Sequence, residues 1–238
     1  MEEYVIIVAG GRGVRMGSDV PKQFMLLSGR PLLFHTIEAF YRCKPDIRTV
    51  LVLPDGQRNH WRSLCSRYGF TVPHLVVSGG ETRFHSVRCG LEFIEREVGG
   101  RAEALSGVFV GVHDGVRPLV DGGTITSVYE RARLKNGAYP AVPITDSVRR
   151  FTDDAEGGSV TVDRTKYFLV QTPQVFRADI LMEAYRQGYM PKFTDDVSVV
   201  ESTGVCKPVM VEGSRRNIKV TDRFDLVIAG ALMNMDLE

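Results

Sequence analysis

Four glycines follow a short apolar run near the N-terminus, and two cationic side chains, Arg15 and Lys22, lie nearby in the sequence. The run Val5 to Val8 leads into Ala9-Gly10-Gly11-Arg12-Gly13-Val14-Arg15-Met16-Gly17, and Lys22 follows within Pro21-Lys22-Gln23-Phe24. Glycines lack a Cβ atom, so backbone N–H groups can approach phosphate oxygens, which an arginine and a lysine can flank. The spacing matches neither GxxxxGK[ST] nor GxGxxG with a ribose-binding acid. The segment predicts a triphosphate-binding loop of another kind, with a solvated glycine-rich turn as the alternative.

A carboxylate follows a second apolar run. Val108 to Val112 is predicted to be a buried strand, and Asp114 stands at its end, in His113-Asp114-Gly115-Val116-Arg117-Pro118. A carboxylate there can hold Mg²⁺, directly or through water, while the ion bridges phosphate oxygens. The alternative is a turn aspartate. Arg117 can either pair with Asp114 and hold the loop, or face the phosphate of a second substrate.

A third segment begins with paired glycines. Gly79-Gly80 precedes a predicted helix whose first turn carries Glu81, Thr82 and Ser86. Backbone N–H groups and a hydroxyl group at such a position can meet a nucleobase edge or a ribose. A plain helix cap is the alternative interpretation.

Strands and helices alternate along most of the chain. Short runs rich in Val, Ile and Leu predict strands at 5–8, 49–53, 75–77, 108–112, 141–144, 168–170 and 209–211. Apolar residues at helical spacing separate most of them, as at Leu33, Ile37 and Phe40. This alternation predicts a doubly wound α/β fold with a mainly parallel sheet, Rossmann-like, and ligands beyond the carboxyl ends of the strands.

One stretch departs from the alternation. Residues 147–166 place Asp153-Asp154 and Gly157-Gly158 between Val148-Arg149-Arg150-Phe151 and Val160-Thr161-Val162, which predicts a β-hairpin arm. A two-stranded hairpin is barely stable alone, so we expect it to pack on a second subunit. No linker is obvious, and residues 1–238 are predicted to form a single domain with 147–166 as a dimerisation arm.

Composition excludes several classes of protein. The 238 residues carry 30 basic and 29 acidic side chains, so no global charge attracts nucleic acid or a membrane. Four scattered cysteines and five histidines make no zinc motif. The chain opens on Met-Glu-Glu without a signal segment or a long apolar span, which predicts a cytoplasmic protein with reduced thiols.

Residues 9–24, AGGRGVRMGSDVPKQF, resemble the signature of sugar-phosphate nucleotidyltransferases, and specifically of the 2-C-methyl-D-erythritol 4-phosphate cytidylyltransferase family. The resemblance runs almost end to end. It continues through Gly79 to Val87, Val112 to Pro118, Gln171 to Phe176, Thr194 to Ser198 and Val211 to Thr221. Small departures are Gly10 in place of an alanine, HDGVRP in place of HDAARP, and TDDVS in place of TDEAS.

The resemblance implies a role for each matching position. The implied catalytic residues, with Arg164 acting across a dimer, are Arg15, Lys22, Arg164 and Lys219. The implied CTP-binding residues are Ala9, Gly10, Gly11, Gly13, Gly80, Glu81, Ser86, Asp114 and Gly115. The implied acceptor-binding residues are Arg117, Ser147, Thr172 and Thr194. Thr172 before proline can also be a restricted extended residue, and Thr194 a helix cap.

The resemblance also implies a reaction. CMP would pass from CTP to 2-C-methyl-D-erythritol 4-phosphate, with Mg²⁺ as cofactor and pyrophosphate as the leaving group, in the non-mevalonate synthesis of isoprenoid precursors. Attack by an already ionised acceptor phosphate needs no protein nucleophile, and cations suit the task of bringing two anions together. A ribitol-5-phosphate cytidylyltransferase and a catalytically silent nucleotide-binding homologue are the alternatives.

Overall fold

The structure is a computed structural model that describes residues 1–10, 20–152 and 157–235. Its main helices are α1 (Leu32–Cys43), α2 (Arg58–Tyr68), α3 (Arg83–Glu97), α4 (Ala102–Ser106), α5 (Gly122–Lys135), α6 (Ala178–Arg186), α7 (Asp196–Glu201) and α8 (Arg223–Asn234). Short 3-10 helices form at η2 (Lys22–Phe24), η3 (Asp55–Gln57) and η4 (Arg164–Lys166).

The main sheet of the described residues has the strand order β10-β7-β11-β6-β1-β4-β5, and β12 pairs with β7. The strands are β1 (Glu2–Val8), β4 (Arg48–Leu53), β5 (Leu75–Ser78), β6 (Val108–Asp114), β7 (Gly137–Pro143), β10 (Phe168–Val170), β11 (Gln174–Arg177) and β12 (Val209–Glu212). Strands β6, β1, β4 and β5 run parallel, whereas β11 runs antiparallel to both neighbours. The predicted doubly wound, mainly parallel fold is confirmed.

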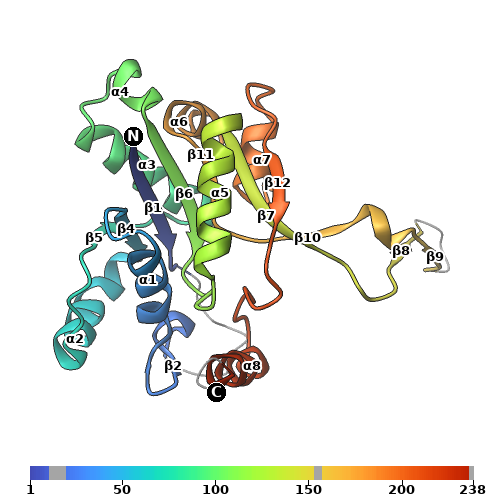
Figure 1. Ribbon diagram of the computed structural model, residues 1–238, viewed down its shortest axis with the longest axis horizontal. Helices are drawn as coiled ribbons and strands as arrows, with labels where there is room; N and C mark the ends of the chain where they lie inside the picture. Colours follow the sequence, from blue (N-terminus) through green and yellow to red (C-terminus); the bar gives the residue numbers. More distant parts are fainter. Residues whose placement is uncertain (11–19, 153–156, 236–238) are drawn as a thin grey trace.

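Alternation along β1 explains the two layers of helices. Tyr4, Ile6 and Val8 pack with residues of α3, α4, α6 and α7, while Val5 and Ile7 pack with residues of α1, α2 and α5. Because successive side chains of a strand point to opposite faces, a continuously apolar strand must be covered on both sides. Figure 1 shows the two layers, with α1 and α5 in front of the sheet and α3 and α6 behind it.

The C-terminal helix α8 lies beyond the carboxyl ends of the strands and closes a small third core. This core contains Leu27, Leu32, Val116, Val220 and Ala229. The Val220 N–H group donates a 2.9 Å hydrogen bond to the Val116 carbonyl, which ties the segment before α8 to the loop after β6. Lys219 is thereby carried to the edge of the sheet where ligands bind in such folds.

The predicted arm is a hairpin that extends from the body of the molecule (Figure 1). Strands β8 (Arg149–Phe151) and β9 (Ser159–Thr161) pair only with each other among the described residues. Phe151 is 81% exposed on it, and the nearby strand β10 also exposes its apolar side chains. Two tiny strands, β2 (Leu26–Leu27) and β3 (Arg30–Pro31), form a separate pair. Within the described ranges, no helix has the length and apolar character needed to cross a membrane.

Candidate active site

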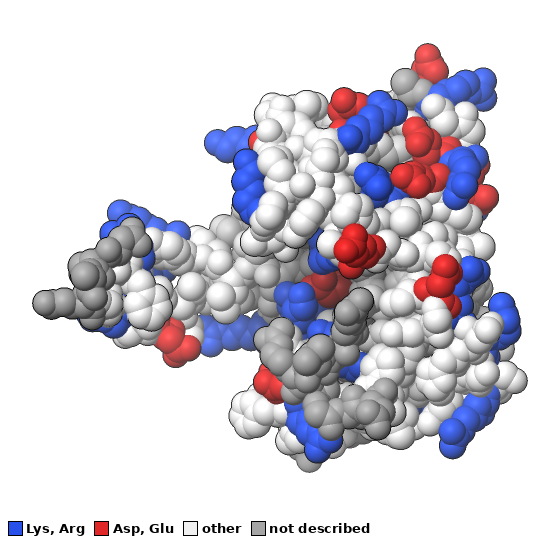
Figure 2. Space-filling model, turned by 180° about the vertical axis from the view of Figure 1, so that it is seen from behind, with Lys and Arg blue, Asp and Glu red and all other residues white. Residues whose placement is uncertain are grey.

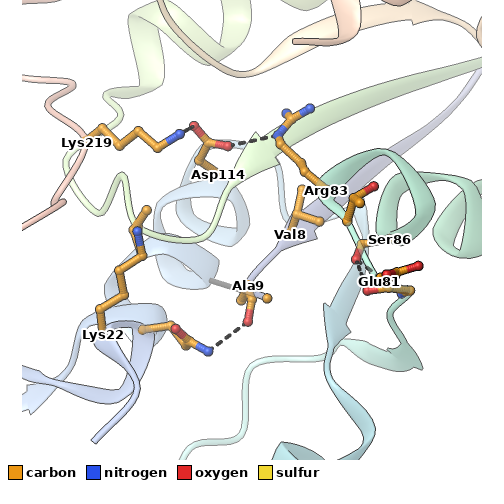
Figure 3. Close-up of a pocket in the computed structure, with 13 residues that line it drawn as sticks. Val8, Ala9, Lys22, Glu81, Arg83, Ser86, Asp114 and Lys219 are labelled. Carbon is orange, nitrogen blue, oxygen red and sulfur yellow. Dashed lines mark hydrogen bonds and ion pairs between the residues drawn. The ribbon is translucent and has the colours of Figure 1, made fainter. Parts of the chain in front are cut away.

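A cavity opens where the carboxyl ends of β1, β5 and β6 meet η2 and the segment before α8 (Figure 3). Eight of the residues predicted from the sequence line this cavity: Ala9, Gly10, Lys22, Gly80, Glu81, Ser86, Asp114 and Lys219. They come from five separate segments of the chain. In Figure 3, Lys22 lies below Lys219 and Asp114, while Glu81 and Ser86 lie on the opposite side of the cavity.

Asp114 ends β6 among three cationic groups. Its Oδ1 atom lies 3.3 Å from Nε of Arg83, and its Oδ2 atom lies 3.3 Å from Nε of Arg117 and 3.0 Å from Nζ of Lys219. Only a tenth of the carboxylate side chain is exposed. One anion therefore fixes the relative positions of three cations, of which Arg83 and Lys219 line the cavity.

The electrostatic effect on Asp114 follows from this geometry. Burial by itself disfavours the charged carboxylate, but the nearby charges of Arg83, Lys219 and Arg117 outweigh burial and hold the pKa of Asp114 well below its usual range. Asp114 is therefore an anion at every pH at which the protein would act. The surplus of positive charge around it suits ligands that carry phosphate groups.

A second adjoining cavity begins on the other side of Lys219. It is lined by Arg117, Asp146, Arg215 and Lys219, among others, near the base of the arm. Figure 2 shows basic side chains gathering on this face near the root of the arm. Lys219 lines both cavities, so one cation can contact groups bound in either of them.

A buried hydrogen-bond relay holds the Asp114 loop. The Thr172 hydroxyl accepts from the Asp114 backbone N–H at 3.1 Å and bonds to Nδ1 of His113 at 3.0 Å. Nε2 of His113 lies 3.2 Å from the Arg117 carbonyl, which can only accept. Nε2 of neutral His113 therefore carries the proton and donates, and Nδ1 accepts from the Thr172 hydroxyl. The side-chain amide of Asn217 donates to the Thr172 backbone carbonyl at 2.8 Å, and the backbone carbonyl of Asn217 accepts from Arg117 at 2.8 Å. The relay joins the segments HDGVRP, QTPQ and NIK.

Replacing Thr172 with valine is expected to destabilise the fold by about 2 kcal/mol, because two buried polar groups lose their partner. Those groups are the Asp114 N–H and Nδ1 of His113. Urea unfolding of Thr172→Val checks this, with Thr49→Val, a buried threonine of β4, as the matched control. An equal loss of free energy of unfolding in both variants would contradict the role given to the relay.

The buried His113 makes stability depend on pH. Burial lowers its pKa to about 4, only partly offset by the Arg117 carbonyl and Asp114. The unfolded chain, in which histidine has its ordinary pKa of about 6.5, binds the proton more readily. The contribution of neutral His113 to the free energy of unfolding is therefore complete above that pH and is lost as pH falls toward 4. Unfolding free energies measured between pH 7 and pH 4 are expected to fall more steeply for the wild type than for His113→Asn. Parallel curves would contradict this prediction.

The paired glycines are required by close packing. Ser86 binds both backbone polar groups of Gly80, at 3.2 Å to N and 3.3 Å to O. A Cβ atom on Gly80 would come within 2.5 Å of His85 Cβ. The helix α3 begins only at Arg83, with Thr82 as its N-cap, so Glu81 lies before the first turn and not within it. Gly80 and Glu81 therefore form the edge of the cavity, and Ser86 holds that edge in place.

Gly115 serves the packing of the loop. Its N–H donates a 2.9 Å bond to the Val8 carbonyl, and a Cβ atom would come within 3.0 Å of the Ala9 side chain. Gly115 does not line the cavity itself. Glycine at this position lets the carboxyl ends of β1 and β6 approach each other closely.

The other predicted residues lie at varying distances from this centre. Gly11, Gly13 and Arg15 fall outside the described residues. Arg164 and Ser147 are exposed in the arm region, where Arg164 donates to the Thr145 carbonyl of its own chain. Neither residue lines the cavity around Asp114.

The structure places three of the residues predicted on the acceptor side in different surroundings. Arg117 pairs with Asp114 and binds the Asn217 carbonyl, which is the loop-holding alternative. Thr172 is buried within the relay. Thr194 is exposed, and the N-cap of α7 is Asp195, one position later, so the alternative of a helix cap at Thr194 is wrong.

Sequence reasoning missed functional neighbours inside motifs that it had singled out. Arg83 lines the cavity and binds Asp114, and Asp196 binds Arg83 in turn. Gln23 is fully buried and donates to the Ala9 carbonyl at 2.9 Å, which fixes the backbone directly after β1. Each of these residues lies in a segment that resembles the family, and that position was the only sequence signal for a role in the site.

The donor set suits a magnesium ion held mainly by its substrate. Among the described residues, no three His, Cys, Asp or Glu side chains come together as a metal site. Mg²⁺ commonly binds one or two carboxylates together with substrate phosphates and several waters. Asp114, at the cavity edge, is compatible with that mode and would contribute one carboxylate, directly or through water.

A doubly wound sheet, a cavity at the carboxyl ends of its strands, and cations gathered around the carboxylate of Asp114 there are the features of a nucleotidyltransferase. The family model of 2-C-methyl-D-erythritol 4-phosphate cytidylyltransferase matches residues 4–235. The chain belongs to this family.

Relatives and solved structures agree with the family model. The enzymes of that name from Bacteroides thetaiotaomicron and Azobacteroides pseudotrichonymphae are 50% and 48% identical, covering 98% of this chain and 100% and 99% of their own. The crystal structure of the Francisella tularensis enzyme superposes with a TM-score of 0.77 at 31% identity, covering 97% of this chain and 99% of that one. The fold and the reaction class predicted from the sequence are confirmed.

Proposed function

We propose that this chain transfers CMP from CTP to 2-C-methyl-D-erythritol 4-phosphate, forming 4-diphosphocytidyl-2-C-methyl-D-erythritol and pyrophosphate. Membership of the family supports this reaction. The observation that carries it in the structure is Lys219, which lies 3.0 Å from Asp114 and lines both adjoining cavities. Two phosphorylated substrates, one in each cavity, would meet at this cation.

The residues implied by the resemblance divide the work between the two substrates. Gly80, Glu81 and the strand end at Ala9 would hold the nucleoside, and Lys22 would contact the triphosphate together with Arg15. Lys219 and Arg164 would position the acceptor phosphate, with Ser147, Thr172 and Thr194 on the acceptor side. An acceptor oxygen then attacks the α-phosphorus of CTP, the bond to the β-phosphate oxygen breaks, and pyrophosphate leaves. Cations that meet the charge as it develops lower the barrier.

We further propose Mg²⁺ as the cofactor, with Asp114 as its protein contact. A bound Mg²⁺ would neutralise and orient the triphosphate. Asp114, held in its charged form, would present its carboxylate at the cavity edge.

We also retain the cytoplasmic location as a prediction from the sequence.

Pyrophosphate release by the purified protein tests the proposal. With CTP and Mg²⁺, turnover is expected with 2-C-methyl-D-erythritol 4-phosphate and not with ribitol 5-phosphate. Better turnover with ribitol 5-phosphate would leave the mechanism standing and overturn the acceptor. Absence of release with both would overturn the activity and favour a silent nucleotide-binding homologue.

We propose that the 147–166 arm makes a homodimer and brings Arg164 to the partner's site. The hairpin exposes Phe151 and Val160, and β10 beside it exposes Phe168, Leu169 and Val170. Apolar side chains gathered on a projecting hairpin and a neighbouring strand favour an interface. In its own chain, Arg164 lies outside the cavity around Asp114.

Mixing two inactive variants tests this arrangement. Arg164→Ala and Lys22→Ala, exchanged at equal amounts, are expected to recover about a quarter of wild-type activity, since about half of the dimers would be mixed and each would hold one complete site. The matched control mixes Lys22→Ala with Lys219→Ala, both of which line one cavity of the same chain. That control is expected to recover nothing. A monomer in light scattering, or recovery in neither mixture, would contradict the shared site.

A further inference from the structure

Arg83 lies between two carboxylates and binds them unequally. Its two terminal nitrogens face Asp196, with Nη1 3.0 Å from Oδ1 and Nη2 2.7 Å from Oδ2. Its Nε atom donates to Oδ1 of Asp114 at 3.3 Å. Asp196 is fully buried, whereas Asp114 is at the cavity edge. The strong, two-pronged contact is therefore with the carboxylate that faces the core.

Asp196 is itself held rigidly. The Tyr185 hydroxyl donates to its Oδ1 atom at 2.6 Å. The preceding residue, Asp195, caps α7 with a reciprocal capping box and accepts from Gln174 at 2.9 Å. The Val197 N–H donates to the same Gln174 side chain. A carboxylate fixed in this way fixes the plane of the guanidinium that binds it with two parallel bonds.

This arrangement determines how Asp114 shares its two oxygens. Since Asp196 takes both terminal nitrogens of Arg83, a single N–H group remains directed at Asp114 Oδ1. Oδ2 is left for Arg117 and Lys219. Figure 3 shows Arg83 and Lys219 reaching Asp114 from opposite sides. Without Arg83, the carboxylate would be free to turn both oxygens toward the acceptor-side cations.

We propose that Arg83, clamped by Asp196, is a positioning residue that holds Oδ1 of Asp114, so that Lys219 pairs with Oδ2 alone and keeps its other N–H groups for the acceptor phosphate. The proposal rests on the proposed function, in which Lys219 contacts that phosphate. Arg83 also joins the TDDVS segment, through Asp196, to the end of β6. A geometric error of this kind at a reacting centre costs roughly 10- to 100-fold in rate.

Arg83→Ala is the test variant, and Arg177→Ala is its matched control. Arg177 makes a comparable two-pronged pair with Asp179, at 2.6 and 2.9 Å, outside the residues that line the cavity. We expect Arg83→Ala to lose roughly 10- to 100-fold in kcat/KM for the acceptor, with a change in the KM for CTP of less than about threefold. Millimolar guanidinium is expected to restore part of the rate to Arg83→Ala and to leave Arg177→Ala unaffected.

Two results would overturn the proposal. One is a folded Arg83→Ala whose kinetic constants for both substrates match those of Arg177→Ala. The other is a loss that guanidinium does not restore while the far-ultraviolet circular dichroism stays at wild-type level. If Arg83→Ala does not fold, Tyr185→Phe removes one bond to Asp196 and leaves the ion pair. A smaller loss of the same kind, confined to acceptor kcat/KM, is then expected, and unchanged kinetics would count against the proposal.

A measurement that needs no turnover separates this proposal from the proposed function. Lysine Nζ groups labelled by reductive ¹³C-methylation report their charge environment by NMR, and the Lys219→Arg spectrum assigns the Lys219 signal. Arg83→Ala is expected to shift that signal, because Asp114 would turn toward it, while Arg177→Ala leaves it in place. An unmoved signal would overturn the positioning role even if the wild type proved to be an active enzyme. If the wild type shows no turnover but Arg83→Ala still shifts the Lys219 signal, only the proposed function is refuted.

Discussion

Replacing Lys22 with alanine is expected to lower kcat by roughly 100- to 1,000-fold, with a much smaller change in the KM for CTP. Lys22 belongs to η2 and lines the cavity across from Lys219 and Asp114 (Figure 3). A fixed cation near the triphosphate counts most when charge moves onto the leaving pyrophosphate, and removal of one such stabiliser costs on this order. Because the contact strengthens in the transition state, the loss belongs to kcat.

The measurement for Lys22 is steady-state pyrophosphate release at saturating acceptor. Lys207→Ala, an exposed lysine between α7 and β12, is the matched control and should retain wild-type rates. A rise in the KM for CTP with unchanged kcat would show that Lys22 binds the nucleotide uniformly in the ground state and in the transition state. That outcome would contradict its assignment as a transition-state stabiliser.

The second large effect is expected at Asp114. Asp114→Asn keeps the shape of the side chain but removes the charge to which Arg83, Arg117 and Lys219 are paired. We expect kcat/KM to fall on the order of 100-fold and the Mg²⁺ concentration for half-maximal rate to rise. Breaking a buried ion pair from one side also leaves cations without their anion, so the free energy of unfolding should fall by about 3 kcal/mol.

The Asp114 experiment combines kinetics across a Mg²⁺ series with urea unfolding. Asp179→Asn, which breaks the pair with Arg177 away from the cavity, is the control for loss of an ion pair alone. If Asp114 only neutralised its neighbours, its removal would make the cavity more positive and tighten CTP without slowing turnover. Tighter CTP binding at an unchanged kcat would therefore contradict both the metal contact and the orienting role.

Much of the fold could be predicted because its strands are short, apolar and separated by amphipathic helices. The run Phe168 to Val170 is a strand with the predicted bounds, and the end of β6 at Asp114 is where the sequence placed its carboxylate. Strand β11, Gln174–Arg177, was not predicted as a strand. It follows a proline and carries two polar ends, and its antiparallel pairing with β6 and β7 depends on neighbours distant in sequence.

The candidate site was predictable where one motif carries the chemistry, and less so where two motifs share it. Lys22, Asp114 and Lys219 each stand in a recognisable segment, and all three line one cavity. The pairing of Arg83 with Asp196 joins residues 113 positions apart. Helical or strand periodicity reports burial along one element and contains no information on such a partner. The same holds for Thr172, whose role in the relay appears only once β6 and the QTPQ segment are adjacent.

Direct transfer between the two substrates can be tested by following the α-phosphorus of CTP. With CTP radiolabelled at that position, a single turnover should move the label to 2-C-methyl-D-erythritol 4-phosphate without labelling the protein, because the acceptor phosphate attacks directly. Transfer should be slower by roughly 100-fold or more in Lys22→Ala and normal in Lys207→Ala. Label retained on the protein, label absent from the acceptor, or equally fast transfer in Lys22→Ala would contradict direct attack assisted by Lys22.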